Sequence, residues 1–167
     1  GNVVASGSSI LDLLDGGCFI IADGSVTYIE NNILLLVNGC WNVTGGNVAL
    51  RDNVRYSLTQ DSVLYVEKGS FVSSHSVDIL IDQSKALISG GSFLIGESSL
   101  ITLRRHSFVD VSSGNAVFSG STETKASYST LSVSGGEVIF TDNAHMKWSS
   151  SDVLVSHGDL IISGEAQ

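Results

Sequence analysis

Residues 135–144 read GGEVIFTDNA, and this pattern recurs along the whole chain. A Gly begins a short apolar stretch, and a polar corner rich in Asp, Asn and Ser ends it. Related stretches start every 22 or 23 residues, at Gly1, Gly24, Gly46, Gly69, Gly91, Gly114, Gly136 and Gly158. So regular a spacing indicates a repeat protein with one structural unit per interval.

Each unit holds three short runs of apolar and β-branched residues separated by polar corners. In the unit that starts at Gly24, these runs are contained in GSVTYIEN (24–31), ILLLV (33–37) and CWNV (40–43). No 3.6-residue periodicity is present, so helical repeats are excluded. We therefore predict an all-β fold, a single-stranded right-handed parallel β-helix (β-solenoid) with about 22–23 residues and three short strands per coil. Residues 1–167 would form one domain, a segment of a longer solenoid.

Alternation along each run separates interior from exterior side chains. It places Val138 and Phe140 inside from the first run, Leu34 and Leu36 from the second, and Trp41 from the third. The sixth unit is weaker, because its second run offers only Thr124 and Ala126 to the core. We therefore expect a bulge or loop around 122–130.

The eighth position of each unit, counted from its Gly, carries small polar residues. We predict a polar corner ladder in which these side chains bond one another and the next coil. Its members are Asn31, Asn53, Ser76, Ser98, Ser121 and Asn143.

The fourth position of each unit faces outward, yet it is mostly apolar. An apolar row along one face usually marks a surface that another molecule covers; alternatively, strand twist buries both rows. The row contains Val4, Thr27, Ala49, Val72, Leu94, Val117, Ile139 and Ile161. Its proposed interaction stripe is Val72, Leu94, Val117, Ile139 and Ile161.

Several side chains share a unit position in adjacent coils. The predicted charge pairs are Arg55 with Asp78, Asp82 with Arg104, and Glu123 with His145. Cys18 and Cys40 also stack. Neighbouring coils are about 4.8 Å apart, close to the lower limit for bridged Cα atoms, so both a disulfide and two reduced thiols fit.

The charge balance excludes one large class of function. The chain carries 17 Asp and Glu against 8 Lys and Arg, a formal net charge of −9. Nucleic-acid binding depends on clustered cations, so we expect no nucleic-acid partner. No apolar run approaches the length of a membrane-spanning helix, so we expect no transmembrane segment in this piece.

Two groups of side chains suggest chemistry, and each has a simpler explanation. Glu30 and Asp52 could share a Ca²⁺ ion, but a solvated acidic corner is the simpler explanation. Asp78, Asp82 and Arg104 resemble the acid and base set of a polysaccharide lyase, but a cross-coil ion pair accounts for two of them. We expect no catalytic residue, cofactor or metal.

The pattern resembles the β-helical adhesin passengers of autotransporters, and most closely the repeats of the polymorphic outer membrane proteins. Phe140 to Asn143 matches their Phe-x-x-Asn motif, Tyr28 to Asn31 and Leu50 to Asn53 match it loosely, and Gly90-Gly91 and Gly45-Gly46 echo their Gly-Gly start.

This resemblance implies an extracellular or cell-surface protein that attaches to a host-surface protein or glycan. Two alternatives stay open, because the fold alone does not fix function. One is a self-assembling filament or coat protein that binds copies of itself. The other is a carbohydrate-active β-helix enzyme or a phage tailspike fragment.

Overall fold

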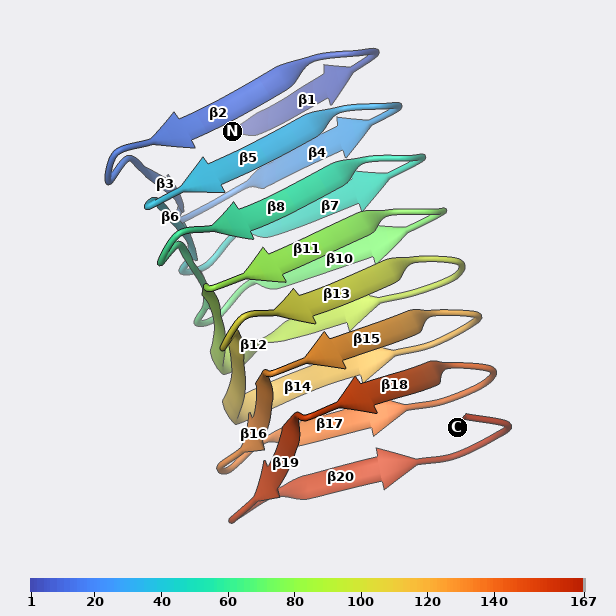
Figure 1. Ribbon diagram of the computed structural model, residues 1–167. Helices are drawn as coiled ribbons and strands as arrows, with labels where there is room; N and C mark the ends of the chain where they lie inside the picture. The colour runs from blue at the N-terminus through green and yellow to red at the C-terminus, as the bar shows by residue number, and fades with distance from the viewer. Residues whose placement is uncertain (167) are drawn as a thin grey trace.

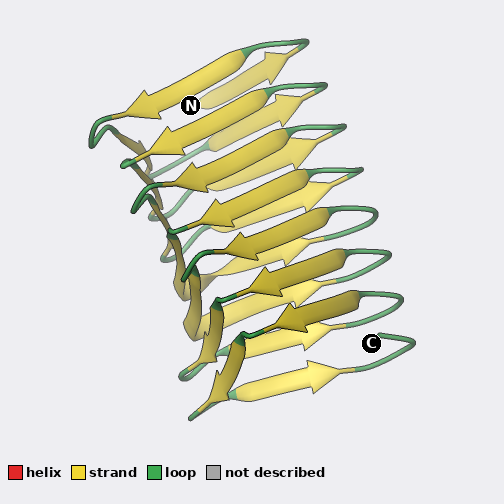
Figure 2. Cartoon of the chain, viewed as in Figure 1, coloured by secondary structure: helices red, strands yellow, loops and turns green. Residues whose placement is uncertain are grey.

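The computed structural model describes residues 1–166, which form an all-β solenoid of about seven coils (Figure 1). The described residues contain no helix; strands alternate with short turns throughout (Figure 2). Followed from the N-terminus in Figure 1, the chain runs along the far sheet, returns along the near one and descends, which makes the solenoid right-handed. The predicted fold class is confirmed.

Each coil contributes a first, a second and a third strand. The first strands are β1 (Asn2–Ser6), β4 (Ser25–Ile29), β7 (Asn47–Arg51), β10 (Ser70–Ser74), β17 (Glu137–Phe140) and β20 (Asp159–Ile162). The second strands are β2 (Ile10–Leu14), β5 (Ile33–Val37), β8 (Arg55–Thr59), β11 (Asp78–Asp82), β13 (Leu100–Arg104), β15 (Glu123–Ser127) and β18 (His145–Ser149). The third strands are β3 (Cys18–Ile21), β6 (Cys40–Val43), β9 (Val63–Val66), β16 (Thr130–Val133) and β19 (Asp152–Val155).

Two long strands turn the corner between a third strand and the next first strand without a break. They are β12 (Lys85–Ile95) and β14 (Phe108–Phe118). As a result the first and third strands form one 13-stranded sheet, while the second strands form a separate sheet of seven. Each strand pairs in parallel with its counterpart one coil later, so the register follows the spacing of the glycines.

The interior contains the side chains that alternation predicts. Val138, Phe140, Leu34, Leu36 and Trp41 are all buried. Aromatic rings also meet from coil to coil, with centroid distances of 5.3 Å for Phe71–Phe93, 6.3 Å for Phe93–Phe118 and 4.5 Å for Phe118–Phe140. Such contacts add stability beyond the area they bury.

The irregular segment is not where the weak sixth unit predicts it. Strand β15 pairs with β13 and β18 without a register shift, and both Thr124 and Ala126 are buried. The irregularity lies instead between β12 and β14, at Ile88 to Ser92, where the long strands turn the corner. The expected bulge at 122–130 is therefore wrong, because pairing on both sides holds β15 straight in spite of its small interior side chains.

The glycine that begins each unit is required mainly by crowding between coils. A Cβ placed on Gly69 would lie 1.8 Å from the carbonyl oxygen of Gly46 in the preceding coil. Gly24 has in addition a φ of +86°, a conformation that favours glycine. Any larger residue would force two coils apart, which explains the strict spacing in the sequence.

Candidate functional site

The apolar stripe is present on the outer face of the first strands. Each member of the stripe is the register partner of the member one coil later. The order along the solenoid is Val72, Leu94, Val117, Ile139 and Ile161. These residues point away from the core and are half-buried in the middle of the row, while Ile161 is 40% exposed. Strand twist therefore does not bury the row, and its middle members present apolar atoms to solvent.

A shallow depression lies along the middle of the stripe. It encloses about 490 Å³, and Val72, Leu94 and Val117 line it together with Glu97 and Asp142 from the following corner. The surface thus combines an apolar strip with carboxylates beside it. This arrangement suits contact with a partner that has apolar side chains flanked by a cation.

The polar corner does not form the predicted ladder. Its six residues Asn31, Asn53, Ser76, Ser98, Ser121 and Asn143 are exposed, and no side-chain hydrogen bond joins them within residues 1–166. Asn31 and Asn53 have φ angles of +51° and +65°. Asn adopts this left-handed conformation more readily than most residues, which explains its presence at the turn. Backbone bonds connect the corner instead, such as the one that the Asn31 amide donates to the Asp52 carbonyl at 3.1 Å.

The position one residue later is buried, and it is polar in some coils but apolar at Val54, Val77 and Ala144. Asn32, Ser99 and Thr122 are buried, and each donates to a carbonyl of its own corner, for example Thr122 Oγ1 to Ser119 O at 2.6 Å. Left-handed residues interrupt the alternation at the corner, two of them at Glu30 and Asn31 but one each at Glu97 and Gly120, so the inward position moves on by one. A prediction from strand alternation alone cannot detect this shift.

One row of buried serines was not predicted, although its regular spacing is visible in the sequence. Ser62, Ser84, Ser107 and Ser129 are buried where the second strand turns into the third. Their hydroxyls contact backbone carbonyls, as in Ser62 Oγ to Thr59 O at 2.6 Å and Ser107 Oγ to Ile81 O at 2.6 Å. These serines recur at the same 22- or 23-residue interval as the glycines and satisfy the polar backbone of that corner.

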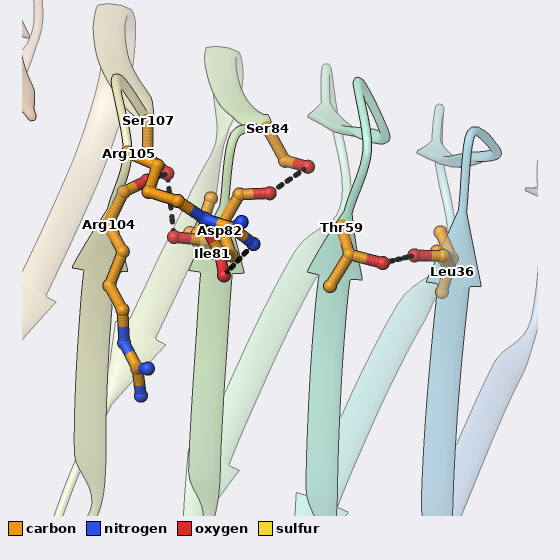
Figure 3. Close-up of polar contacts among 8 residues, drawn as sticks. All are labelled: Leu36, Thr59, Ile81, Asp82, Ser84, Arg104, Arg105 and Ser107. Carbon is orange, nitrogen blue, oxygen red and sulfur yellow. Dashed lines mark hydrogen bonds and ion pairs between the residues drawn. The ribbon is translucent and has the colours of Figure 1, made fainter.

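Asp82 pairs with Arg105, and the predicted pair with Arg104 is wrong. The two carboxylate oxygens accept bonds from Arg105 Nε and Nη2, both at 2.6 Å, while Arg104 points away along its strand (Figure 3). Arg104 is the register partner of Asp82, but its side chain extends away from the carboxylate, whereas Arg105, one residue later, turns back over it (Figure 3). The bonds to Asp82 raise the pKa of the Arg105 guanidinium above its usual value.

Two further predicted charge pairs have different outcomes. Arg55 Nε lies 3.7 Å from an Asp78 carboxylate oxygen, with both side chains largely exposed. Glu123 does not pair with His145; it lies 2.8 Å from Lys125 Nζ and 2.6 Å from Lys147 Nζ. Hydrogen bonds from these two ammonium groups lower the pKa of Glu123 to about 2.

Cys18 and Cys40 form a disulfide between the first two coils. They are direct register partners, and their Cα atoms are 4.5 Å apart. The disulfide is thus formed without any departure from the coil spacing. Of the two states left open by the sequence, the structure contains the bridged one.

Asp52, one of the two carboxylates considered for a cation, lies near a histidine. His75 lies between Asp52 and Glu97, with its Nε2 3.0 Å from a Glu97 oxygen and its Nδ1 4.0 Å from Asp52. Over residues 1–166, no group of three or more His, Cys, Asp and Glu side chains is arranged to hold a metal ion. Asp82 is nearly buried and bonded to Arg105, and Arg104 points away from it (Figure 3).

Among the described residues there is no helix long and apolar enough to span a membrane. Comparisons of the chain with models of protein families, with curated proteins and with solved structures gave no match.

Proposed function

We propose that this chain is a non-catalytic structural and adhesive segment of an extracellular or cell-surface β-solenoid. The observation that carries the proposal is the apolar stripe. A row of outward Val, Leu and Ile side chains is costly in water unless a partner covers it, and the same surface has carboxylates along one side.

The disulfide supports the extracellular location. Bridges such as Cys18–Cys40 persist in oxidising compartments and are rare where thiols are kept reduced. The rigid stacking of coils supports a structural role, because each coil contacts only its neighbours and the surface between corners stays regular. In such a protein, binding is spread over a face instead of being concentrated in a deep pocket.

The stripe is tested with matched Leu-to-Asp changes. Leu94 lies on the stripe, while Leu80 faces outward from a second strand and is half-buried like Leu94. Fluorescently labelled protein would be applied to a panel of cultured animal cells, and binding measured by flow cytometry. We expect Leu94→Asp and Ile139→Asp to reduce binding at least about tenfold and Leu80→Asp to leave it unchanged.

The fold of each variant is checked by circular dichroism and thermal unfolding. If a folded Leu94→Asp protein binds as strongly as the parent chain, the stripe is not the contact surface. If Leu80→Asp weakens cell binding as much as Leu94→Asp does, the loss is a non-specific effect of the added charge.

A self-assembling structural protein is the second candidate, because the stripe can also face the stripe of another copy. Light scattering after size exclusion separates the two. A monomer at high concentration contradicts self-assembly through the stripe, whereas a defined oligomer that Leu94→Asp dissociates supports it. The carbohydrate-active alternative predicts turnover of a substrate in a polysaccharide panel. If such turnover occurs and Arg104→Ala abolishes it, the enzyme alternative holds and the adhesive proposal is wrong.

A further inference from the structure

A second surface concavity lies at the corner between the second and third strands, away from the stripe. Two depressions adjoin there and share His106 and Tyr128 in their linings. One encloses about 660 Å³ and the other about 280 Å³. We call the pair the Tyr128 trough.

The trough crosses several coils. Its lining extends from Asp61 through Gln83 and Tyr128 to Ser150, and these residues occupy the same corner in successive coils. Four coil steps of about 4.8 Å correspond to roughly 19 Å along the solenoid. That length suits an extended chain of several units rather than one small molecule.

The backbone at this corner is not free to bind a peptide strand. The amide of Asp61 donates to Gln83 O at 2.8 Å, that of Gln83 to Arg104 O at 3.1 Å, and that of His106 to Tyr128 O at 2.6 Å. Strand addition needs unpaired main-chain groups, so a ligand of the trough must be recognised by side chains.

Most of the lining side chains are polar, with Phe108 and Tyr128 as the aromatic members, and the charges nearly cancel. Lys85 and Arg105 are cationic, while Asp61 and Asp152 line the same trough as anions. Asp82, bonded to Arg105 below the surface, offsets that guanidinium. Over these five charged groups the sum is slightly negative, so a polyanionic ligand would be repelled.

Tyr128 supplies an apolar surface among these hydrogen-bonding groups. It is 61% exposed, an unusual position for a large aromatic ring, and lines both depressions. The guanidinium of Arg105 uses two donors on Asp82, which fixes its orientation and leaves its other N–H groups available.

We infer that the Tyr128 trough binds a neutral, linear oligosaccharide. A sugar chain presents apolar ring faces that pack on an aromatic ring and hydroxyl groups that exchange hydrogen bonds with Gln83, Lys85 and Arg105. Its lack of charge matches the near-neutral lining, and its extended form matches the trough. This site does not depend on the apolar stripe or on its partner.

The test uses a panel of neutral hexasaccharides, namely cellohexaose, xylohexaose, mannohexaose and maltohexaose, with hexagalacturonate as the anionic probe. Binding to the whole chain is measured by saturation-transfer-difference NMR and titration calorimetry. Tyr128→Asn removes the ring while keeping a residue that tolerates the φ of +51° at this position. Tyr65→Ala is the control, because Tyr65 is 37% exposed on a third strand and does not line the trough.

We expect at least one neutral hexasaccharide to bind, with saturation transfer to its ring protons. Tyr128→Asn should weaken it about tenfold or more, and His106→Asn should also weaken it, while Tyr65→Ala and Leu94→Asp have no effect. The inference is overturned if no neutral probe binds, if hexagalacturonate alone binds, or if a folded Tyr128→Asn protein binds as the parent does. Failure of the Leu94→Asp test above would leave this result unaffected.

Discussion

Asp82 is bonded through both carboxylate oxygens to Arg105, although Arg104 is the residue that stands opposite it in the sheet. The carboxylate lies nearly buried at the end of β11, whereas Arg105 turns back over it from a left-handed corner. One residue of displacement along the chain thus decides which of two adjacent arginines has a partner.

Replacing these arginines should have unequal effects on stability. Arg105→Gln removes the partner of a nearly buried carboxylate and should lower the melting temperature clearly. Arg104→Gln, the matched change, should have little effect, because Arg104 is exposed and points away from Asp82 (Figure 3). Gln is suited to the corner, since Gln83 has a similar φ there. Equal melting temperatures for the two variants would contradict the assigned pair.

Thr124 is a site where a substitution should stabilise the fold. Its Oγ1 is buried without a hydrogen-bond partner among the described residues, and it lines a small apolar cavity with Phe93 and Phe118. Thr124→Val should raise the free energy of unfolding by about 1 kcal/mol. Thr122→Val should instead lower it by about 1 kcal/mol, because Thr122 Oγ1 donates to Ser119 O at 2.6 Å. Urea unfolding of both variants measures the difference, and a stabilised Thr122→Val would refute this explanation.

The disulfide should stabilise the first coils most. It closes a loop of 22 residues, which corresponds to about 3 kcal/mol in the chain-entropy model. Because coils interact mainly with their neighbours, reduction should increase amide exchange in β1 to β6 and much less in β15 to β18. Hydrogen-exchange mass spectrometry with and without reductant checks this. Uniform loss of protection along the chain would show that the coils unfold as one unit.

Glu123 should make stability depend on acid. Its pKa is lowered from 4.5 to about 2 by hydrogen bonds from Lys125 and then Lys147. A depressed folded-state pKa means that the contribution is complete above the unfolded value and is lost as pH falls from 4.5 towards 2. Glu123→Gln should therefore show a shallower loss of stability across this range. Glu137→Gln, at an exposed position, is the control, and identical profiles for all three proteins would exclude the effect.

The repeat spacing made most of the fold predictable. A glycine forced by the close approach of two coils recurs once per coil, so Gly69 and its counterparts reveal both the unit length and the register. Within straight strands, alternation then identifies the interior correctly, as at Leu34 and Leu36. The outward row through Leu94 follows from the same alternation.

The corners were less predictable, because alternation does not continue through left-handed residues. The predicted ladder at Asn31 does not form, because the inward position of that corner is Asn32. Likewise, the carboxylate predicted to pair with Arg104 pairs with Arg105. The Tyr128 trough was missed for the same reason, since its residues come together only where the corner folds. Ser62 and its counterparts, by contrast, could have been found from their spacing.

Trp41 is fully buried and has Phe19 at 5.2 Å and Tyr56 at 5.3 Å between ring centroids, whereas Trp148 is half-buried in β18. The chain has two tryptophans in all, and they lie in coils far apart along the solenoid. Their emission therefore provides separate optical signals from two ends of the stack. A Trp41→Phe protein and a Trp148→Phe protein, each followed by fluorescence during heating, would report whether distant coils melt together or one after the other.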